Sequence, residues 1–122
     1  MNNPSPQTIW ETYTRAWSEI DTKAQQDLFH ISLHPDCVYT DPFTQATGYA
    51  VLSGYMAELQ KNVPGAHFIT TDFKSHDGGS LAHWNMADAA GNILAPGASY
   101  GRYGADGRLV QMAGFYQPPS AG

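Results

Sequence analysis

The chain has 122 residues, of which 42% are hydrophobic, and it contains three Trp, seven Tyr and five Phe. This length and composition predict one folded domain over residues 1–122 and exclude a disordered chain. The formal net charge of −5 at pH 7, with no cluster of Lys and Arg, argues against proteins that bind nucleic acid or anionic membranes. The single cysteine, Cys37, excludes an internal disulfide.

No segment of the sequence is typical of export or of membrane insertion. The first ten residues, MNNPSPQTIW, lack the basic and then apolar order of a secretory signal. No apolar stretch approaches the roughly 18 residues that span a bilayer. We therefore expect a cytoplasmic protein that does not bind membranes.

The first predicted helix begins at Ser5-Pro6, because Ser suits an N-cap and Pro suits the first helical position. We interpret residues 1–4 as a loose tail. Apolar side chains then recur every three or four residues, which is the helical period. They are Ile9, Trp10, Tyr13, Ala16, Trp17 and Ile20. This stripe predicts a helix whose aromatic face packs in the core.

A second helix is predicted from Asp21, which is a good N-cap, to about His34. Pro35 ends it, because a proline disfavours helical geometry in the residue before it. The residues between them include several apolar side chains that one helical face can bury.

The five histidines raise the question of a metal site. His30 and His34 are four residues apart, which is the spacing of two metal ligands on one helical face. No third ligand follows in a recognisable pattern, so we predict no metal and interpret both as ordinary helix residues. A site that uses His67, His76 or His83 stays an alternative, and it requires the fold to bring them together.

The stretch from Cys37 to Gly48 predicts a short strand, Cys37–Thr40, followed by Asp41-Pro42 and a polar turn. Asp41 then lies at a strand end between Tyr39 and Phe43. A carboxylate in such apolar surroundings suits a general base. The alternative interpretation is that Asp41 only starts the turn, because Asp-Pro is common turn chemistry.

A third helix is predicted over Tyr49–Asn62, with a stripe of apolar side chains. The stripe consists of Leu52, Tyr55, Met56, Leu59 and Val63. Gly54 inside this helix costs about 1 kcal/mol relative to Ala, which suggests close packing at that position.

The rest of the chain predicts four strands, at residues 66–76, 80–88, 93–103 and 108–117. Asp77-Gly78-Gly79 predicts a tight hairpin between the first two of them. Pro96-Gly97 predicts a bulge or bend inside the third. We interpret residues 118–122 as a loose tail.

Three helices followed by four strands indicate an α+β fold, in which a bent sheet wraps the helices. Alternation places two sets of residues on shared faces of their strands. They are Ala82, Trp84 and Met86 in one strand, and Val110, Met112, Gly114 and Tyr116 in another. These side chains either form the wall of an apolar cavity or fill the core, and periodicity does not separate the two.

Several short motifs resemble the SnoaL-like and ketosteroid-isomerase-like branch of the nuclear-transport-factor-2-like (NTF2-like) superfamily. They are AW at Ala16-Trp17, PDCVYTDPF at Pro35–Phe43, Gly48 before a helix, PGAHF at Pro64–Phe68, HW at His83-Trp84 and DGRLVQMAGFY at Asp106–Tyr116. The resemblance implies a conical α+β barrel, three N-terminal helices within a strongly bent, mostly antiparallel sheet, and a deep hydrophobic pocket. It also implies a homodimer through the outer sheet face, which we expect to include Phe68 or Phe73.

The resemblance carries over only in part to the catalytic residues. Asp41, followed by Pro42 and Phe43, matches the Asp-Pro of ketosteroid isomerases, whose Asp is the general base. The two oxyanion donors of that family, a Tyr and a protonated Asp, fall here on Ala16 or Trp17 and on Ser99. Tyr13 or Ser99 is the available donor. Met112 and Tyr116 match a pocket Met and a pocket aromatic residue.

The sequence therefore predicts an isomerase, cyclase or dehydratase that needs no cofactor and acts on a small hydrophobic carbonyl compound, with Asp41 as base. The predicted pocket residues are Tyr13, Trp17, Tyr39, Phe43, Tyr55, Met56, Trp84, Met86, Ser99, Met112 and Tyr116. The alternative function is a non-catalytic small-molecule-binding or interaction module of the same fold, because the two donors are replaced.

Overall fold

A computed structural model describes residues 4–117. The helices are α1 (Pro6–Ala16), α2 (Thr22–Ser32) and α3 (Tyr49–Asn62). The strands are β1 (Leu33–Asp41), β2 (Thr44–Thr47), β3 (His67–His76), β4 (Gly79–Ala87), β5 (Ile93–Tyr103) and β6 (Leu109–Phe115).

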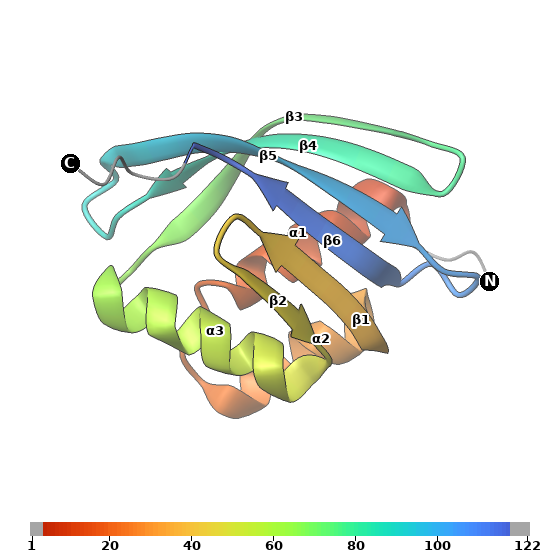
Figure 1. The fold of residues 1–122 in the computed structure, drawn as a ribbon, viewed down its shortest axis with the longest axis horizontal. Coiled ribbons are helices and arrows are strands. Elements are labelled where there is room, and N and C mark those ends of the chain that lie inside the picture. The colour runs from red at the N-terminus through yellow and green to blue at the C-terminus, as the bar shows by residue number, and fades with distance from the viewer. Residues whose placement is uncertain (1–3, 118–122) are drawn as a thin grey trace.

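The strands form one sheet in the order β2-β1-β6-β5-β4-β3. β3 to β6 are an antiparallel meander, and β1 joins it parallel to β6. Figure 1 shows the sheet curving over the helices, with α3 beside the β1–β2 hairpin. This arrangement confirms the predicted α+β fold with a bent, mostly antiparallel sheet.

Helix α1 begins as predicted, because the Ser5 side chain caps it and accepts a hydrogen bond from the Thr8 amide at 3.1 Å. The helix ends at Ala16, and the buried stripe continues only to Trp17. Ile20 is 82% exposed. Its assignment to the stripe is wrong, because the chain has left the helix before it reaches that position.

Helix α2 begins at its predicted cap, where Asp21 accepts from the Ala24 amide at 2.9 Å. It ends at Ser32, two residues earlier than predicted. Leu33 is extended, fully buried and paired with Leu109 of β6. The pairing with a distant strand overrides the local helical pattern here.

Strand β2 is an element that the sequence pattern does not reveal. Thr44–Thr47 pairs with the end of β1, and Pro42 and Phe43 form the turn between them. Only Ala46 in β2 is buried. A short edge strand of mostly polar residues lacks the apolar alternation that identifies a strand, so its sequence predicts only a polar turn.

A bulge in β3 decides which side chains face the helices. The register with β4 shifts between Thr70 and Asp72. Because the extra residue reverses the alternation, Phe68 before it and Phe73 after it both pack against the core. The expectation that one of them lies on the outer face is wrong.

Two further local expectations are wrong. Pro96 and Gly97 keep a regular register with β4, and the shift lies at Leu94 instead. β6 pairs with β5 only from Ala98 onward, so Pro96 lies where β5 has one neighbour and a proline is tolerated. A Cβ atom on Gly54 would meet nothing within 4 Å, so this glycine does not mark close packing.

The hairpin between β3 and β4 is confirmed. Asp77 and Gly78 form its two-residue turn, and both have positive φ angles, 51° and 76°. Across residues 4–117, the helices are too short or too polar to cross a membrane.

Candidate functional site

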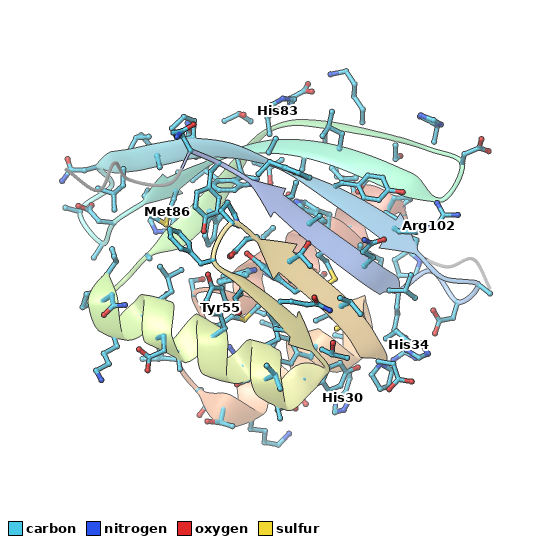
Figure 2. The ribbon with its side chains drawn as sticks, in the orientation of Figure 1. His30, His34, Tyr55, His83, Met86 and Arg102 are labelled. Atoms are coloured by element: carbon cyan, nitrogen blue, oxygen red, sulfur yellow. The ribbon has the colours of Figure 1, made fainter. Side chains whose placement is uncertain are left out.

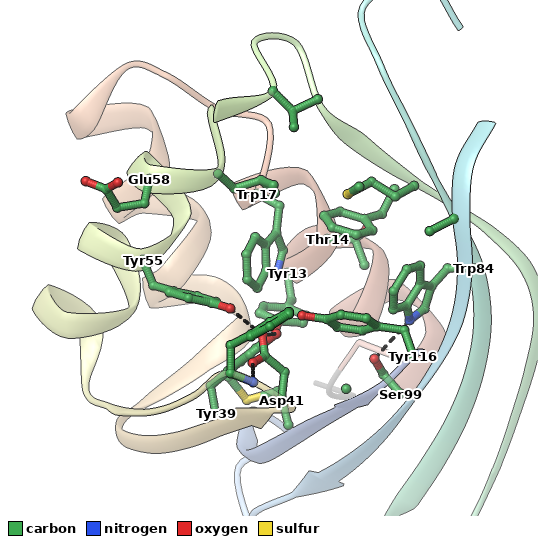
Figure 3. Close-up of a pocket in the computed structure, with 18 of the residues that line it drawn as sticks. Tyr13, Thr14, Trp17, Tyr39, Asp41, Tyr55, Glu58, Trp84, Ser99 and Tyr116 are labelled. Carbon is green, nitrogen blue, oxygen red and sulfur yellow. Dashed lines mark hydrogen bonds between the residues drawn. The ribbon is translucent and has the colours of Figure 1, made fainter. Parts of the chain in front are cut away.

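A cavity of about 480 Å³ lies between the concave face of the sheet and helices α1 and α3 (Figure 3). Eleven of the twelve residues that the sequence singles out lie on its wall. These are Tyr13, Trp17, Tyr39, Asp41, Phe43, Tyr55, Trp84, Met86, Ser99, Met112 and Tyr116. The fold thus brings together residues that are up to 103 positions apart in the sequence.

Met56 is the predicted pocket residue that the structure places elsewhere. It is 1% exposed, and its sulfur accepts from the Gln25 amide at 3.6 Å in the helical core. Neighbouring residues on a helix point about 100° apart, so Tyr55 faces the cavity while Met56 faces α1 and α2. The sequence of a broad apolar stripe does not indicate which of its side chains face the cavity and which face the core.

Aromatic rings form a nearly continuous wall, which we call the aromatic belt. It consists of Tyr39, Tyr55, Trp17, Phe68, Trp84 and Tyr116. Neighbouring ring centroids in it lie 5.0 to 6.1 Å apart, mostly in edge-to-face or tilted contacts. Such contacts are favourable and hold the rings in fixed positions. The belt therefore supplies a rigid apolar surface.

The two carboxylate oxygens of Asp41 accept hydrogen bonds from different groups. Oδ1 accepts from the backbone amides of Phe43 at 2.8 Å and Thr44 at 3.1 Å, within the β1–β2 turn. Oδ2 accepts from the hydroxyls of Tyr39 at 2.6 Å and Tyr55 at 2.7 Å (Figure 3). Oδ1 thus stabilises the turn, as one interpretation expects. Asp41 also lines the cavity, and its role as a general base stays a prediction.

The tyrosines around Asp41 are held in their neutral form. Burial, to which the negative charge of Asp41 adds, raises the pKa of Tyr39 and of Tyr55 well above the usual range. The same causes raise the pKa of Tyr116 to about 12. Figure 3 shows the Tyr116 hydroxyl directed toward this cluster. At neutral pH these groups are hydrogen-bond donors and not bases.

Ser99 lies on the cavity wall, and Trp84 orients it. The Trp84 indole Nε1 donates to Ser99 Oγ at 3.0 Å, so the serine hydroxyl is free to donate its own proton elsewhere. The indole lies across Gly97, where an added Cβ atom would be 2.3 Å from the ring. Gly97 is therefore required for this position of Trp84.

Gly114 forms the floor between Asp41 and Ser99. A Cβ atom placed on it would lie 3.7 Å from both Asp41 Cβ and Ser99 Oγ, and 3.6 Å from the Tyr39 hydroxyl. A ligand group that occupies this space touches the carboxylate side and the serine side at once.

Several wall residues were not predicted as pocket residues. They are Trp10, Thr14, Glu58, Leu59, Asn62, Val63, Phe68, Ala95, Gly114 and Gln117. Trp10 is one helical turn before Tyr13, and its Nε1 is a buried donor without an acceptor among residues 4–117. The helical period places Trp10 on the face of Tyr13, and strand alternation places Gly114 on the face of Met112 and Tyr116. Neither pattern separates a residue of the core from a residue of the cavity wall.

No group of three or more His, Cys, Asp or Glu side chains within residues 4–117 is arranged to hold a metal ion. Figure 2 shows His30 and His34 near the end of α2 and His83 on the opposite side of the molecule. His67 and His76 lie at the two ends of one strand, β3.

Comparison with known proteins identifies the fold. No family model matches the chain. No curated protein matches it either. Among solved structures, a candidate isomerase of the SnoaL-like family from Agrobacterium tumefaciens matches with a TM-score of 0.83 and 23% identity, over 92% of this chain and 97% of its own. The chain has the NTF2-like fold.

Two further structures agree with this fold assignment. A candidate polyketide cyclase from Sinorhizobium meliloti has a TM-score of 0.71 and 16% identity, over 91% of this chain and 99% of its own. An NTF2-like protein of unknown function from an Exiguobacterium species has a TM-score of 0.72 and 14% identity, with the same coverage. Identities this low establish the NTF2-like fold, and the activity has to be argued from the site.

Proposed function

We propose that this NTF2-like protein is an isomerase, cyclase or dehydratase that acts on a small hydrophobic carbonyl compound without a cofactor. The observation that carries the proposal is the placement of Asp41 and Ser99 on the two sides of Gly114, within one apolar cavity. The names of the structural neighbours, isomerase and polyketide cyclase, support the same type of chemistry.

Asp41 is the general base of the proposed mechanism. Its Oδ2 takes a proton from the carbon next to the substrate carbonyl, and the electron pair of the broken C–H bond moves into an enolate. Oδ2 accepts from two tyrosines in the resting site, so one of them gives up its bond as the proton arrives. Tyr55 is less buried than Tyr39, so its hydroxyl is the one that turns its proton to another acceptor while the ring stays in the aromatic belt. Return of the proton to another carbon completes an isomerisation.

Ser99 is the donor to the developing oxyanion. Trp84 occupies a lone pair of Ser99 Oγ, so the hydroxyl proton is available to a substrate oxygen above Gly114. A donor placed where negative charge develops stabilises the transition state more than the ground state. A neutral serine is a weaker donor than the protonated Asp of ketosteroid isomerases, so the proposed substrate has a more acidic C–H bond than a simple ketone.

A second candidate function is a non-catalytic binding module. The observation that favours it is the saturation of Asp41, since its two oxygens accept four hydrogen bonds from protein donors. In this case the carboxylate is a fixed structural charge, and the cavity binds a ligand without turnover.

Exchange of carbon-bound hydrogen separates the two functions. A panel of cyclic 1,3-dicarbonyl compounds and enones is incubated in D₂O, and loss of the α-proton signal is followed by NMR. Enzyme function predicts accelerated exchange that Asp41→Asn abolishes and that Ser99→Ala slows by about 100-fold. Asp36→Asn is the matched control, because Asp36 is an exposed residue of the same strand and does not line the cavity. Binding without exchange in the wild type supports the module, and unchanged exchange in Asp41→Asn contradicts the base.

A further inference from the structure

Within residues 4–117, the charge of Asp41 on the cavity wall has no partner of opposite sign. Asp41 is part-buried, and its four hydrogen-bond donors are two neutral hydroxyls and two backbone amides. No ion pair within residues 4–117 includes it. A carboxylate that leaves water without a counter-ion is costly. A ligand with a positive charge would supply the missing partner.

Cationic side chains are absent from this part of the molecule. The six Lys and Arg residues of the chain all lie within residues 4–117, and none of them lines the cavity. No histidine lines it either. The wall carries one other charged residue, Glu58, whose carboxylate Figure 3 shows directed away from Asp41. An anionic ligand would therefore find no Lys, Arg or His side chain of residues 4–117 on the wall, and the charges of Asp41 and Glu58 would repel it.

The aromatic belt favours the same sign of charge. A cation within about 6 Å of a Trp or Tyr ring centroid is attracted by the negative face of the ring, and the attraction grows when water is excluded. Within the belt, Trp17 contacts both Tyr55 and Phe68, and Phe68 contacts Trp84, so one ligand can reach several rings. Fixed rings around one carboxylate are the arrangement that recognises organic ammonium groups.

We propose that the ligand of this cavity is a ring-bearing organic cation, an amine that is protonated or fully substituted at neutral pH. Its ammonium group lies within the aromatic belt, where the negative charge of Asp41 attracts it, and its rings fill the rest of the cavity. As a statement of the substrate class of the site, the inference rests on the proposed function. A positive charge next to a carbonyl also makes the neighbouring C–H bond more acidic, which is the property that a weak donor such as Ser99 requires.

A matched set of probes tests the charge preference without any need for turnover. The set comprises benzyltrimethylammonium, its neutral isostere neopentylbenzene, and phenylacetate as the anion. Binding is followed by the fluorescence of the three tryptophans on the wall, Trp10, Trp17 and Trp84. We expect the ammonium to bind at least about tenfold more tightly than the neutral isostere, and phenylacetate to bind most weakly.

Two variants assign the preference to Asp41. Asp41→Asn is expected to remove most of the difference between the ammonium and the isostere and to leave binding of the isostere nearly unchanged. The side-chain oxygen of Asn can still accept from the turn amides, so the fold is expected to persist. Asp36→Asn removes the same formal charge from the exposed part of the strand and is expected to keep the preference.

Three results overturn the inference: an isostere that binds as tightly as the ammonium, an ammonium that does not bind, or a preference that survives Asp41→Asn. Each is distinguishable from failure of the proposed function. If the protein catalyses hydrogen exchange but shows no preference for cations, the proposed enzyme function is supported and the proposed ligand class is wrong. If it prefers cations but catalyses no exchange, the ligand class is supported and the protein is a binding module.

Discussion

The Tyr55 hydroxyl donates to Oδ2 of Asp41 at 2.7 Å and so connects helix α3 to the end of β1. The two residues are 14 positions apart, and between them the chain forms the β2 hairpin and the start of α3. Because Oδ1 is bound to the turn amides, this bond together with that of Tyr39 determines which way the carboxylate faces. The helix therefore positions the group on which the proposed chemistry depends.

Removal of this hydroxyl is expected to destabilise the protein. Tyr55→Phe deletes one of the two hydrogen bonds to Oδ2 and leaves the ring in the aromatic belt. Hydrogen bonds to charged groups contribute about 1.5 to 3 kcal/mol, and half-exposure of Tyr55 places the loss in unfolding free energy near the lower figure. Urea unfolding measures it. Tyr100→Phe, on the outer face of β5, is the matched control, and an equal loss in both variants contradicts the assigned role.

Two glycine-to-alanine changes are expected to have opposite signs. Gly97→Ala places a Cβ atom 2.3 Å from the Trp84 indole, so the indole must move, at a cost of about 1 to 3 kcal/mol. Gly54→Ala adds a methyl group in open space inside α3 and is expected to stabilise by about 0.5 to 1 kcal/mol. Thermal unfolding of both variants is the measurement. A stable Gly97→Ala protein with unchanged tryptophan fluorescence would show that the indole does not lie across this glycine.

Stability is expected to fall in alkaline solution. Burial raises the pKa of Tyr103 from 10.0 to about 12, and burial with the charge of Asp41 does the same for Tyr116. Between about pH 10 and pH 12 the unfolded chain releases these protons and the folded chain keeps them, so the unfolding free energy decreases as the pH rises. Below about pH 10 both states hold the protons, and these groups cause no change.

Urea unfolding between about pH 9 and pH 12 tests this expectation. Tyr103→Phe removes one of the titrating groups, so its stability is expected to decline less steeply than that of the wild type. A flat profile across this range would mean that these phenols ionise alike in the folded and unfolded chains.

We expect a homodimer that forms through the outer face of the sheet. Cross-strand partners share a face, which places Leu81 and Phe115 together on the side away from the helices, where they are 42% and 63% exposed. Exposed apolar side chains that gather on one sheet face are typical of protein interfaces. Sedimentation equilibrium at micromolar concentration measures the mass. Phe115→Glu is expected to give monomers, and Ile20→Glu, in the exposed segment between α1 and α2, is not. A wild-type protein that is monomeric at this concentration contradicts the prediction.

Features that depend on neighbouring residues were predictable from the sequence. The Ser5 cap, the bounds of α3 and the Asp77-Gly78 turn follow from capping and turn chemistry, which act over a few positions. The position of Asp41 at a strand end follows in the same way from Pro42. The α+β class follows from the order of these local signals.

Only the tertiary structure determined which side chains of those elements line the cavity. One bulge in β3 turned both Phe68 and Phe73 inward, and the rotation of α3 directed Tyr55 to the cavity and Met56 to the core. Periodicity identifies an apolar side chain but not the surface that it meets, because core and cavity wall bury the same residue types. The bond from Tyr55 to Asp41 joins two separate elements, and no cation among the described residues pairs with this carboxylate; both facts appear only in the folded chain.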